Sequence, residues 1–206
     1  MSYLMIFITA IFVNNIVLSQ FLGICPFLGV SKKLDQATGM SIAGIFVMLL
    51  ATAVTYPIQY FILNPNGMAY MQTIVFILVI AALVQMVEIV LKKLSPSLYQ
   101  ALGVFLPLIT TNCCILGVSI LVANGTYNAQ GLEPNLLTGT IYALCTALGF
   151  ALALILFAGI REQMSLVKIP KGMQGMSIAL VTAGLLAMAF MGFSGMDKGI
   201  VAFFGI

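Results

Sequence analysis

Two of the four cysteines lie in closely similar sequence contexts, 88 positions apart. The segment Cys25–Ser31 reads CPFLGVS and the segment Cys113–Ser119 reads CCILGVS, so five of the seven positions are identical. Thiolates bind soft metals and iron–sulfur clusters, but a free cysteine is also a common small packing residue. The repeat makes Cys25 and Cys113 candidate ligands, with inert packing as the alternative. A disulfide is disfavoured if the pair is reached mainly from a reducing cytosol.

The other two cysteines, Cys114 and Cys145, have no equivalent cysteine in the repeat, since position 26 opposite Cys114 is Pro26. We expect both to be apolar packing residues. A [2Fe–2S] cluster or a tetrahedral site needs four ligands, and Cys25 and Cys113 supply two. The simplest way to complete the set is a partner chain that contributes two more cysteines. Ligand counting therefore predicts a hetero-oligomer that shares one cluster.

Several kinds of chemistry are excluded by composition. The chain has no histidine, which excludes histidine-ligated haem, zinc–histidine catalysis and a Ser-His-Asp triad within it. Its net charge of +3 is too small and too scattered for nucleic-acid binding. We find no catalytic nucleophile or acid–base pair, so any enzyme activity would belong to a larger complex.

The elements that carry these residues are predicted to cross a membrane. Hydrophobic residues make up 62% of the 206 residues and charged residues only 6%, and no charge occurs between Asp35 and Glu88 or between Lys93 and Glu133. Continuous apolar runs longer than about 20 residues indicate transmembrane helices rather than barrel strands. No Lys or Arg precedes Lys32, so the first segment is interpreted as a permanent span and not a signal peptide. Six spans are predicted: Tyr3–Val30, Thr38–Leu63, Tyr70–Leu91, Ala101–Ala123, Leu136–Ile160 and Gly172–Ser194.

The basic residues predict the orientation of these spans. Seven of the eight lie in three alternate loops: Lys32 and Lys33, then Lys92 and Lys93, then Arg161, Lys168 and Lys171. Because basic loops stay in the cytosol, both termini are expected on the non-cytosolic side of the cell membrane.

The chain is predicted to be a single membrane domain, residues 1–206, built from two three-span repeats at 1–95 and 96–206. Besides the cysteine segments, Met71–Glu88 matches Met173–Phe190 at seven of 18 positions. Because each repeat has an odd number of spans, the second copy enters the membrane from the opposite side, which gives an inverted repeat. The fold class is therefore an all-α integral membrane protein with six transmembrane helices.

The first and fourth helices are expected to be discontinuous. Gly23 and Pro26 surround Cys25 in the first, and Pro107 followed by Thr110–Cys113 interrupts the fourth. Discontinuous helices near the midplane often form the functional site of inverted-repeat proteins, whereas a kinked packing helix is the plainer alternative.

At these residues the sequence resembles a known family. The segments Asn14–Leu18, Gly23–Lys33, Gly103–Cys113 and Thr182–Gly195 resemble the A subunits of the Rnf ion-translocating electron-transport complexes, a family related to the E subunit of the sodium-translocating NADH:quinone reductase. The resemblance covers essentially the whole chain. It implies a membrane component of a ferredoxin:NAD oxidoreductase.

The resemblance also implies a site and partners. In this family, the A and E subunits are homologous, oppositely oriented and share a [2Fe–2S] cluster, to which Cys25 and Cys113 would contribute here. The resemblance also implies the B, C, D and G subunits as partners, with the flavins on subunits other than this one. Electrons would pass through the cluster between the cytosolic side and those flavins. Hydrogen bonds to sulfur would come from backbone amides near Gly23, Leu28, Gly29, Asn112 and Gly117, and they would raise the reduction potential of the cluster.

Two alternatives stay open from the sequence. A small secondary ion transporter, or a purely structural membrane component, would suit an inverted repeat with broken helices equally well. Glu88 within the third span either pairs with Lys92 four residues later or lies on an ion path. The paired cysteines distinguish the redox function, because transport does not require them.

Overall fold

The computed structural model describes residues 6–67, 69–94, 106–125, 135–167, 175–193, 195, 196 and 199. Every regular element within these ranges is a helix. The predicted span starts at Tyr3, Ala101 and Gly172 lie outside the described residues.

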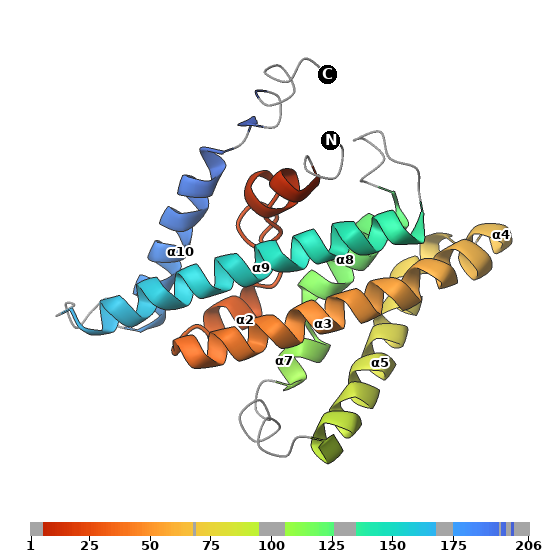
Figure 1. Ribbon diagram of the computed structural model, residues 1–206, viewed down its shortest axis with the longest axis horizontal. Coiled ribbons are helices and arrows are strands. Elements are labelled where there is room, and N and C mark those ends of the chain that lie inside the picture. The colour runs from red at the N-terminus through yellow and green to blue at the C-terminus, as the bar shows by residue number, and fades with distance from the viewer. Residues whose placement is uncertain are drawn as a thin grey trace.

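Two long helices, α3 (Leu34–Ile58) and α9 (Leu136–Ser165), form the centre of the molecule. They run antiparallel and side by side along its long axis (Figure 1) and make the most extensive contact between any two described elements. Small residues let them approach: an added Cβ at Gly44 of α3 would lie 3.4 Å from the Phe150 ring of α9. Close helix contacts through small residues are typical of packing in membranes.

The far end of α3 changes its helical geometry near a proline. Pro57 has no amide hydrogen to donate, and the chain passes into the π-helix η2 (Gln59–Leu63) directly after Ile58. A single short turn, α4 (Asn64–Asn66), follows and ends at Gly67, where φ is +64°. The Asn-Pro-Asn-Gly segment, which lies between the second and third predicted spans, thus extends the helix by one turn before ending it.

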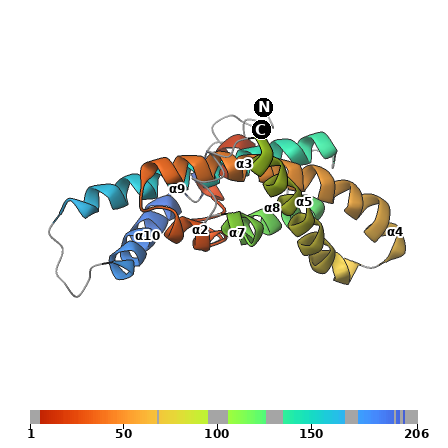
Figure 2. The same ribbon diagram turned by 90° about the horizontal axis from the view of Figure 1, so that it is seen from below.

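The remaining elements lie around this pair. The π-helix η1 (Thr9–Val13) contacts α9, whereas α8 (Cys113–Ala123) contacts both α3 and α9. The short helices α2 (Ile24–Gly29) and α7 (Leu106–Thr110) lie on the same side of the pair (Figure 2). Helix α5 (Gln72–Leu94), preceded by the short helix η3 (Ala69–Met71), and helix α10 (Met176–Met191) diverge at opposite ends of the molecule.

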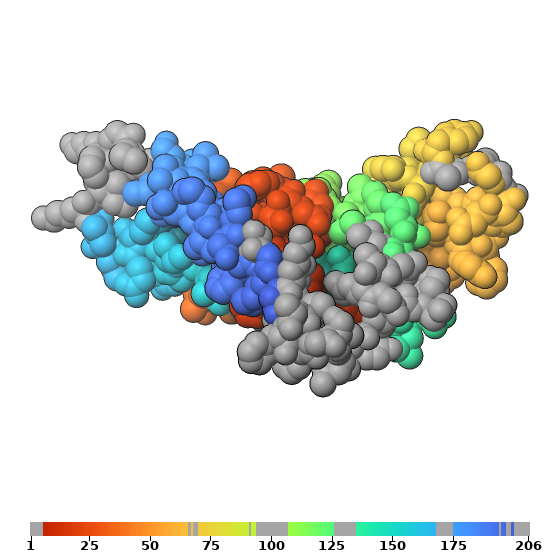
Figure 3. Space-filling view, turned by 90° about the horizontal axis from the view of Figure 1, so that it is seen from above, coloured from red at the N-terminus to blue at the C-terminus, as the bar shows by residue number. Residues whose placement is uncertain are grey.

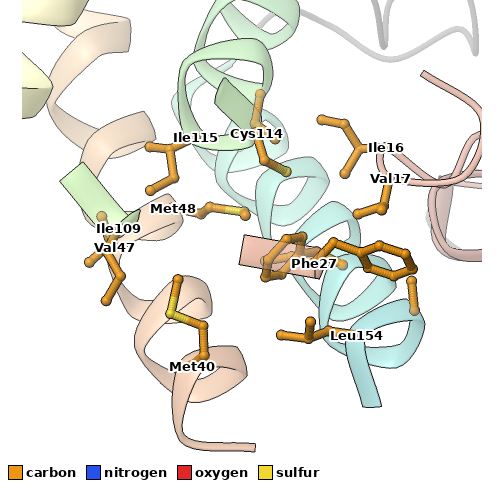
Figure 4. Close-up of a cluster of buried hydrophobic side chains, with 14 of the residues drawn as sticks. Ile16, Val17, Phe27, Met40, Val47, Met48, Ile109, Cys114, Ile115 and Leu154 are labelled. Atoms are coloured by element: carbon orange, nitrogen blue, oxygen red, sulfur yellow. The ribbon is translucent and has the colours of Figure 1, made fainter. Parts of the chain in front are cut away.

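The core forms where these elements meet. Phe27, Met40, Met48, Ile115 and Leu154 come from four different helices and are each at most 3% exposed (Figure 4). Buried hydroxyl groups there are satisfied inside their own helices. The pattern, in which each hydroxyl donates to the carbonyl four residues earlier, holds for Ser41, Thr52, Thr55, Ser119 and Thr146. No water is needed to satisfy these groups, which suits a low-dielectric surrounding.

Three described helical segments are long and apolar enough to cross a membrane: Leu34–Leu63, Gln72–Val90 and Leu136–Ser165. Two shorter apolar segments are Pro107–Ala123 and Met176–Met191. Exposed apolar side chains cover α5 in particular, including Ile74, Leu78 and Ile89, each more than 60% exposed. Such an apolar exterior is expected where lipid or another membrane protein replaces water.

One predicted boundary was wrong in a way that affects the site. The fifth span was expected to end at Ile160, with Arg161 in the following loop, but α9 continues through Arg161 to Ser165. Arginine is a good helix former, and its long side chain reaches away from the apolar part of the helix. Arg161 therefore belongs to the helical scaffold.

Candidate metal centre

The first helix is interrupted well before Cys25. The π-helix η1 ends at Asn14, where the backbone leaves helical geometry (φ −107°, ψ 49°), and helix resumes only at Ile24. An unbroken helix would place Cys25 about 33 Å from Tyr3 along its axis, at 1.5 Å per residue. Because the helix is interrupted, its rise does not fix the depth of Cys25 in the membrane. The segment between the two helices needs other partners for its backbone groups.

Asn15 supplies those partners. Its side chain is fully buried; Nδ2 donates to the carbonyls of Ile11 (3.1 Å) and Gly149 (2.8 Å), and Oδ1 accepts from the amide of Val17 (3.1 Å). One side chain thus replaces helical hydrogen bonds on both sides of the break and ties it to α9.

Gly23 ends the first interruption in a conformation that only glycine adopts easily. Its φ is +79°, and an added Cβ would lie 3.1 Å from the Cβ of Cys114, 3.2 Å from the Phe150 ring and 3.3 Å from Oδ1 of Asn112. The backbone of the first interruption therefore lies directly against the second one. Figure 3 shows the two regions side by side at the middle of one face, in red-orange and green.

The second interruption is shorter. Helix α7 ends at Thr110, two residues follow, and α8 begins at Cys113. Asn112 is the N-cap of α8, with its Oδ1 accepting from the amide of Cys114 at 3.0 Å. This arrangement places Cys113 at the first position of an eleven-residue helix, the end at which the helix dipole favours a negative charge.

A single hydrogen bond joins the two interruptions at sulfur. The amide of Gly23 donates to Sγ of Cys113, with 2.9 Å between the two atoms. Of the predicted amide donors, Gly23 thus does contact a sulfur, whereas the amide of Asn112 donates to the carbonyl of Ile109 (3.3 Å). Gly23 is two residues before Cys25, so the contact brings the two repeated cysteine segments together.

The four cysteines divide into two classes. Cys25 and Cys113 are exposed thiols, whereas Cys114 is fully buried and Cys145 is 5% exposed. Cys114 lies among Ile16, Ile115 and Met48 in the core (Figure 4). The packing role expected for Cys114 and Cys145 agrees with this burial.

The residues at the exposed pair suit a metal–sulfur group as half of a ligand set. Two thiols are accessible, one of them already accepts a backbone hydrogen bond, and Nδ2 of Asn112 is buried without an acceptor in the described part of the chain. The described residues contain no group of three or more cysteine, aspartate or glutamate side chains that would hold a metal alone. Within the described residues, Cys25 and Cys113 thus supply two of the four ligands that such a site needs.

Sequence reasoning missed two residues that hold this region. Arg161 of α9 donates through one guanidinium nitrogen to the carbonyl of Leu28 (2.7 Å) and to Oγ of Ser31 (3.0 Å). Asn15 was noticed only as part of a motif, not as the residue that bridges the break to α9. These contacts to Leu28, Ser31 and Gly149 span at least 130 positions of the chain, a pairing that no local pattern reveals.

Glu88, the acidic residue of the third predicted span, lies half-buried on α5. It takes no part in the contacts that join the two cysteine segments.

The described residues form an all-helical membrane protein with two exposed cysteines at adjoining helix interruptions. A family model described as "Rnf-Nqr subunit, membrane protein" matches residues 3–197. The chain belongs to this Rnf-Nqr family of membrane proteins.

Curated relatives cover nearly the whole chain. The A subunit of the Na+-translocating ferredoxin:NAD+ oxidoreductase complex of Acetobacterium woodii is 58% identical over 199 residues, which cover 97% of this chain and all of the relative. The A subunit of the ion-translocating oxidoreductase complex of Syntrophotalea carbinolica is 52% identical, with 96% of this chain and 99% of the relative covered. Its counterpart from Edwardsiella ictaluri is 50% identical over 197 residues, with 96% of this chain and 98% of the relative covered. The resemblance to the A subunits of Rnf complexes is confirmed.

Proposed function

We propose that this chain is the A subunit, in the membrane, of an ion-translocating ferredoxin:NAD oxidoreductase complex and holds half of an intramembrane [2Fe–2S] cluster. Cys25 and Cys113 would be its two ligands from this chain. The names of the relatives support the complex, and the cysteine geometry supports the half-site. The observation that carries the proposal is the hydrogen bond from the Gly23 amide to Cys113 Sγ, which joins the two cysteine segments.

The residues of this chain would do three things for such a cluster. Cys25 and Cys113 present thiolates, Asn112 caps the helix that carries Cys113, and the Gly23 amide donates to sulfur. Hydrogen bonds to sulfur stabilise the additional negative charge of the reduced state and so raise the reduction potential. When bound, a [2Fe–2S] cluster takes up and releases single electrons.

The other two ligands would come from a homologous chain of opposite orientation, the E subunit of the complex. Two exposed thiols on an apolar surface are suited to a site that a second membrane protein completes. The other partners would be the B, C, D and G subunits, and the flavins are expected only on subunits other than this one.

The proposed architecture is six transmembrane helices in two inverted three-helix repeats, in the cell membrane, with both termini on the non-cytosolic side. The interrupted segments before α2 and α8, the long helices α3 and α9, and the splayed helices α5 and α10 would be the equivalent pairs. This assignment is supported by the cysteine repeat and by the order of these elements along the chain.

The test uses the assembled complex purified with all its subunits, in the wild type and in Cys25→Ala and Cys113→Ala variants. We expect each variant to lose the iron and the reduced-state electron paramagnetic resonance signal of one [2Fe–2S] cluster. Cys145→Ala is the matched control, because Cys145 is buried and should not be a ligand. Full retention of iron and spectrum in either ligand variant refutes the assignment, and an assembled wild-type complex without this cluster would favour an ion transporter.

A further inference from the structure

Helix α9 contacts the interruption before α2, and α2 itself, at several successive points. The carbonyl of Gly149 accepts from Asn15, the ring of Phe150 lies next to Gly23, and Phe157 stacks on Phe27 with 4.2 Å between ring centroids and 16° between planes. One turn further along, Arg161 reaches the end of α2. Residues 150, 157 and 161 are spaced by seven and four, so they share one face of the helix.

Arg161 satisfies groups at the end of α2 that the helix itself leaves without partners. A helix leaves its last carbonyls unpaired, and α2 has only six residues. The guanidinium donates to the Leu28 carbonyl at 2.7 Å and to the fully buried Ser31 hydroxyl at 3.0 Å. Its positive charge also lies at the helix end where cations are favoured.

A helix as short as α2 has no stability of its own, because isolated helices below about 12–15 residues are marginal. Its orientation must therefore come from its neighbours, which are α7 and, through Phe157 and Arg161, α9. Cys25 precedes Leu28 by three residues in this helix, so both residues move with it as one unit.

We propose that Arg161 is a positioning residue for the redox site: by capping α2 it fixes the orientation of the Cys25 thiol, and its charge favours the reduced state of the bound group. This inference rests on the proposed function. Both bonds start from one guanidinium nitrogen, whose two hydrogens are fixed in the plane of the group, whereas a lysine ammonium would keep the charge with looser geometry.

The experiment compares the assembled complex carrying Arg161→Gln, Arg161→Lys or Ser31→Ala with the wild type. Each is measured for iron content, for the electron paramagnetic resonance line shape and for the midpoint potential of the [2Fe–2S] signal. Lys32→Gln is the matched control, since it removes one positive charge beside Ser31 from an exposed side chain.

We expect Arg161→Gln to lower the iron content of the purified complex, because the end of α2 loses the bonds that hold it. Its remaining signal should be broadened and shifted to a lower potential. Arg161→Lys should restore the potential in part but not the line shape, Ser31→Ala should broaden the signal slightly, and Lys32→Gln should match the wild type.

The outcomes separate the two proposals. A wild-type complex without the signal overturns the proposed function and this inference with it. A wild-type signal that is unchanged in Arg161→Gln, or changed equally in Lys32→Gln, overturns only the positioning role. If Arg161→Gln does not assemble, the decision falls to Arg161→Lys and Ser31→Ala: altered line shapes support the role, and wild-type spectra in both overturn it.

Discussion

At the scale of single residues, the site depends on one backbone amide and the space around it. Gly23 combines a left-handed φ of +79° with a hydrogen bond to Cys113 Sγ, and three atoms lie within 3.3 Å of where its Cβ would be. Two of these belong to Asn112 and Cys114, the neighbours of Cys113. The residue therefore links the geometry of one interruption directly to the sulfur at the other.

Gly23→Ala is expected to disturb this link. The left-handed conformation alone costs a non-glycine residue about 1–2 kcal/mol. The added methyl group would also push the backbone away from Cys114 and weaken the hydrogen bond to Cys113. We expect a lower midpoint potential of the cluster signal in the assembled complex, because a sulfur that loses a donor holds the reduced state less well.

The control for this variant is Gly184→Ala on α10, where an added Cβ meets no atom within 4 Å. We expect wild-type potential and assembly for it. A Gly23→Ala complex with an unchanged potential would mean that the amide–sulfur bond has no electrostatic role.

How far these residues can be predicted from sequence depends on the range of their contacts. Gly23 could be selected as a donor because it lies two positions before Cys25, at the predicted break of the first helix. Arg161 could not, because its partners in residues 28–31 are at least 130 positions away and its own surroundings only indicate the end of a span. The same limit applies to the contact of Asn15 with Gly149.

At the scale of elements, the two interruptions are stabilised by asparagine side chains. Asn15 bonds across the first break, and Asn112 caps the helix after the second. Asparagine can both donate and accept, so one side chain replaces two kinds of missing backbone bond. In lipid such replacement is required, because water does not reach the unpaired groups.

Asn15→Ala should therefore destabilise the protein. It removes a fully buried side chain and leaves the Gly149 carbonyl and the Val17 amide without these partners. Each buried polar group left unpaired costs about 1–3 kcal/mol. The measurement is the thermal unfolding midpoint of the detergent-solubilised complex, together with its yield from membranes.

The neighbouring Asn14→Ala variant is the control, because the Asn14 side chain is exposed and the hydrogen bond from its backbone amide to the Thr9 carbonyl is kept. We expect little change in its unfolding midpoint. Equal loss in both variants would point to a general sensitivity of this segment instead of a specific role for Asn15.

Proline and glycine in the sequence predict where the helices are interrupted, but they do not predict the structure of the interruptions. Pro26 and Pro107 lie within short helices, α2 and α7, and the interruptions fall just before the first and just after the second. Proline fits the first turn of a helix, where its missing amide hydrogen is not needed. The π-helical stretch at Thr9–Val13 has no comparable sequence signal.

At the scale of the whole molecule, the antiparallel pair α3–α9 brings distant parts of the chain to one end. Arg161, near the end of α9, bonds to Leu28 and Ser31, directly before Lys32 and Lys33 at the start of α3. Two of the three predicted basic loops thus begin at the same end of the pair. This is the arrangement expected if both loops face the cytosol.

Reporter fusions test which side of the membrane the basic loops and the C-terminus face. A reporter fused to Ile206 should read as non-cytosolic, and a reporter inserted after Lys93 should read as cytosolic, because basic residues near span ends stay on the cytosolic side. Paired fusions of a periplasmically active and a cytosolically active reporter at each site give opposite signals and so control for expression. A cytosolic reading at Ile206 would show that the chain has the opposite orientation, and the homologous partner proposed to complete the cysteine site would then need the orientation proposed here for this chain. With the expected reading, Arg161 and the α2 end that it holds lie toward the cytosol.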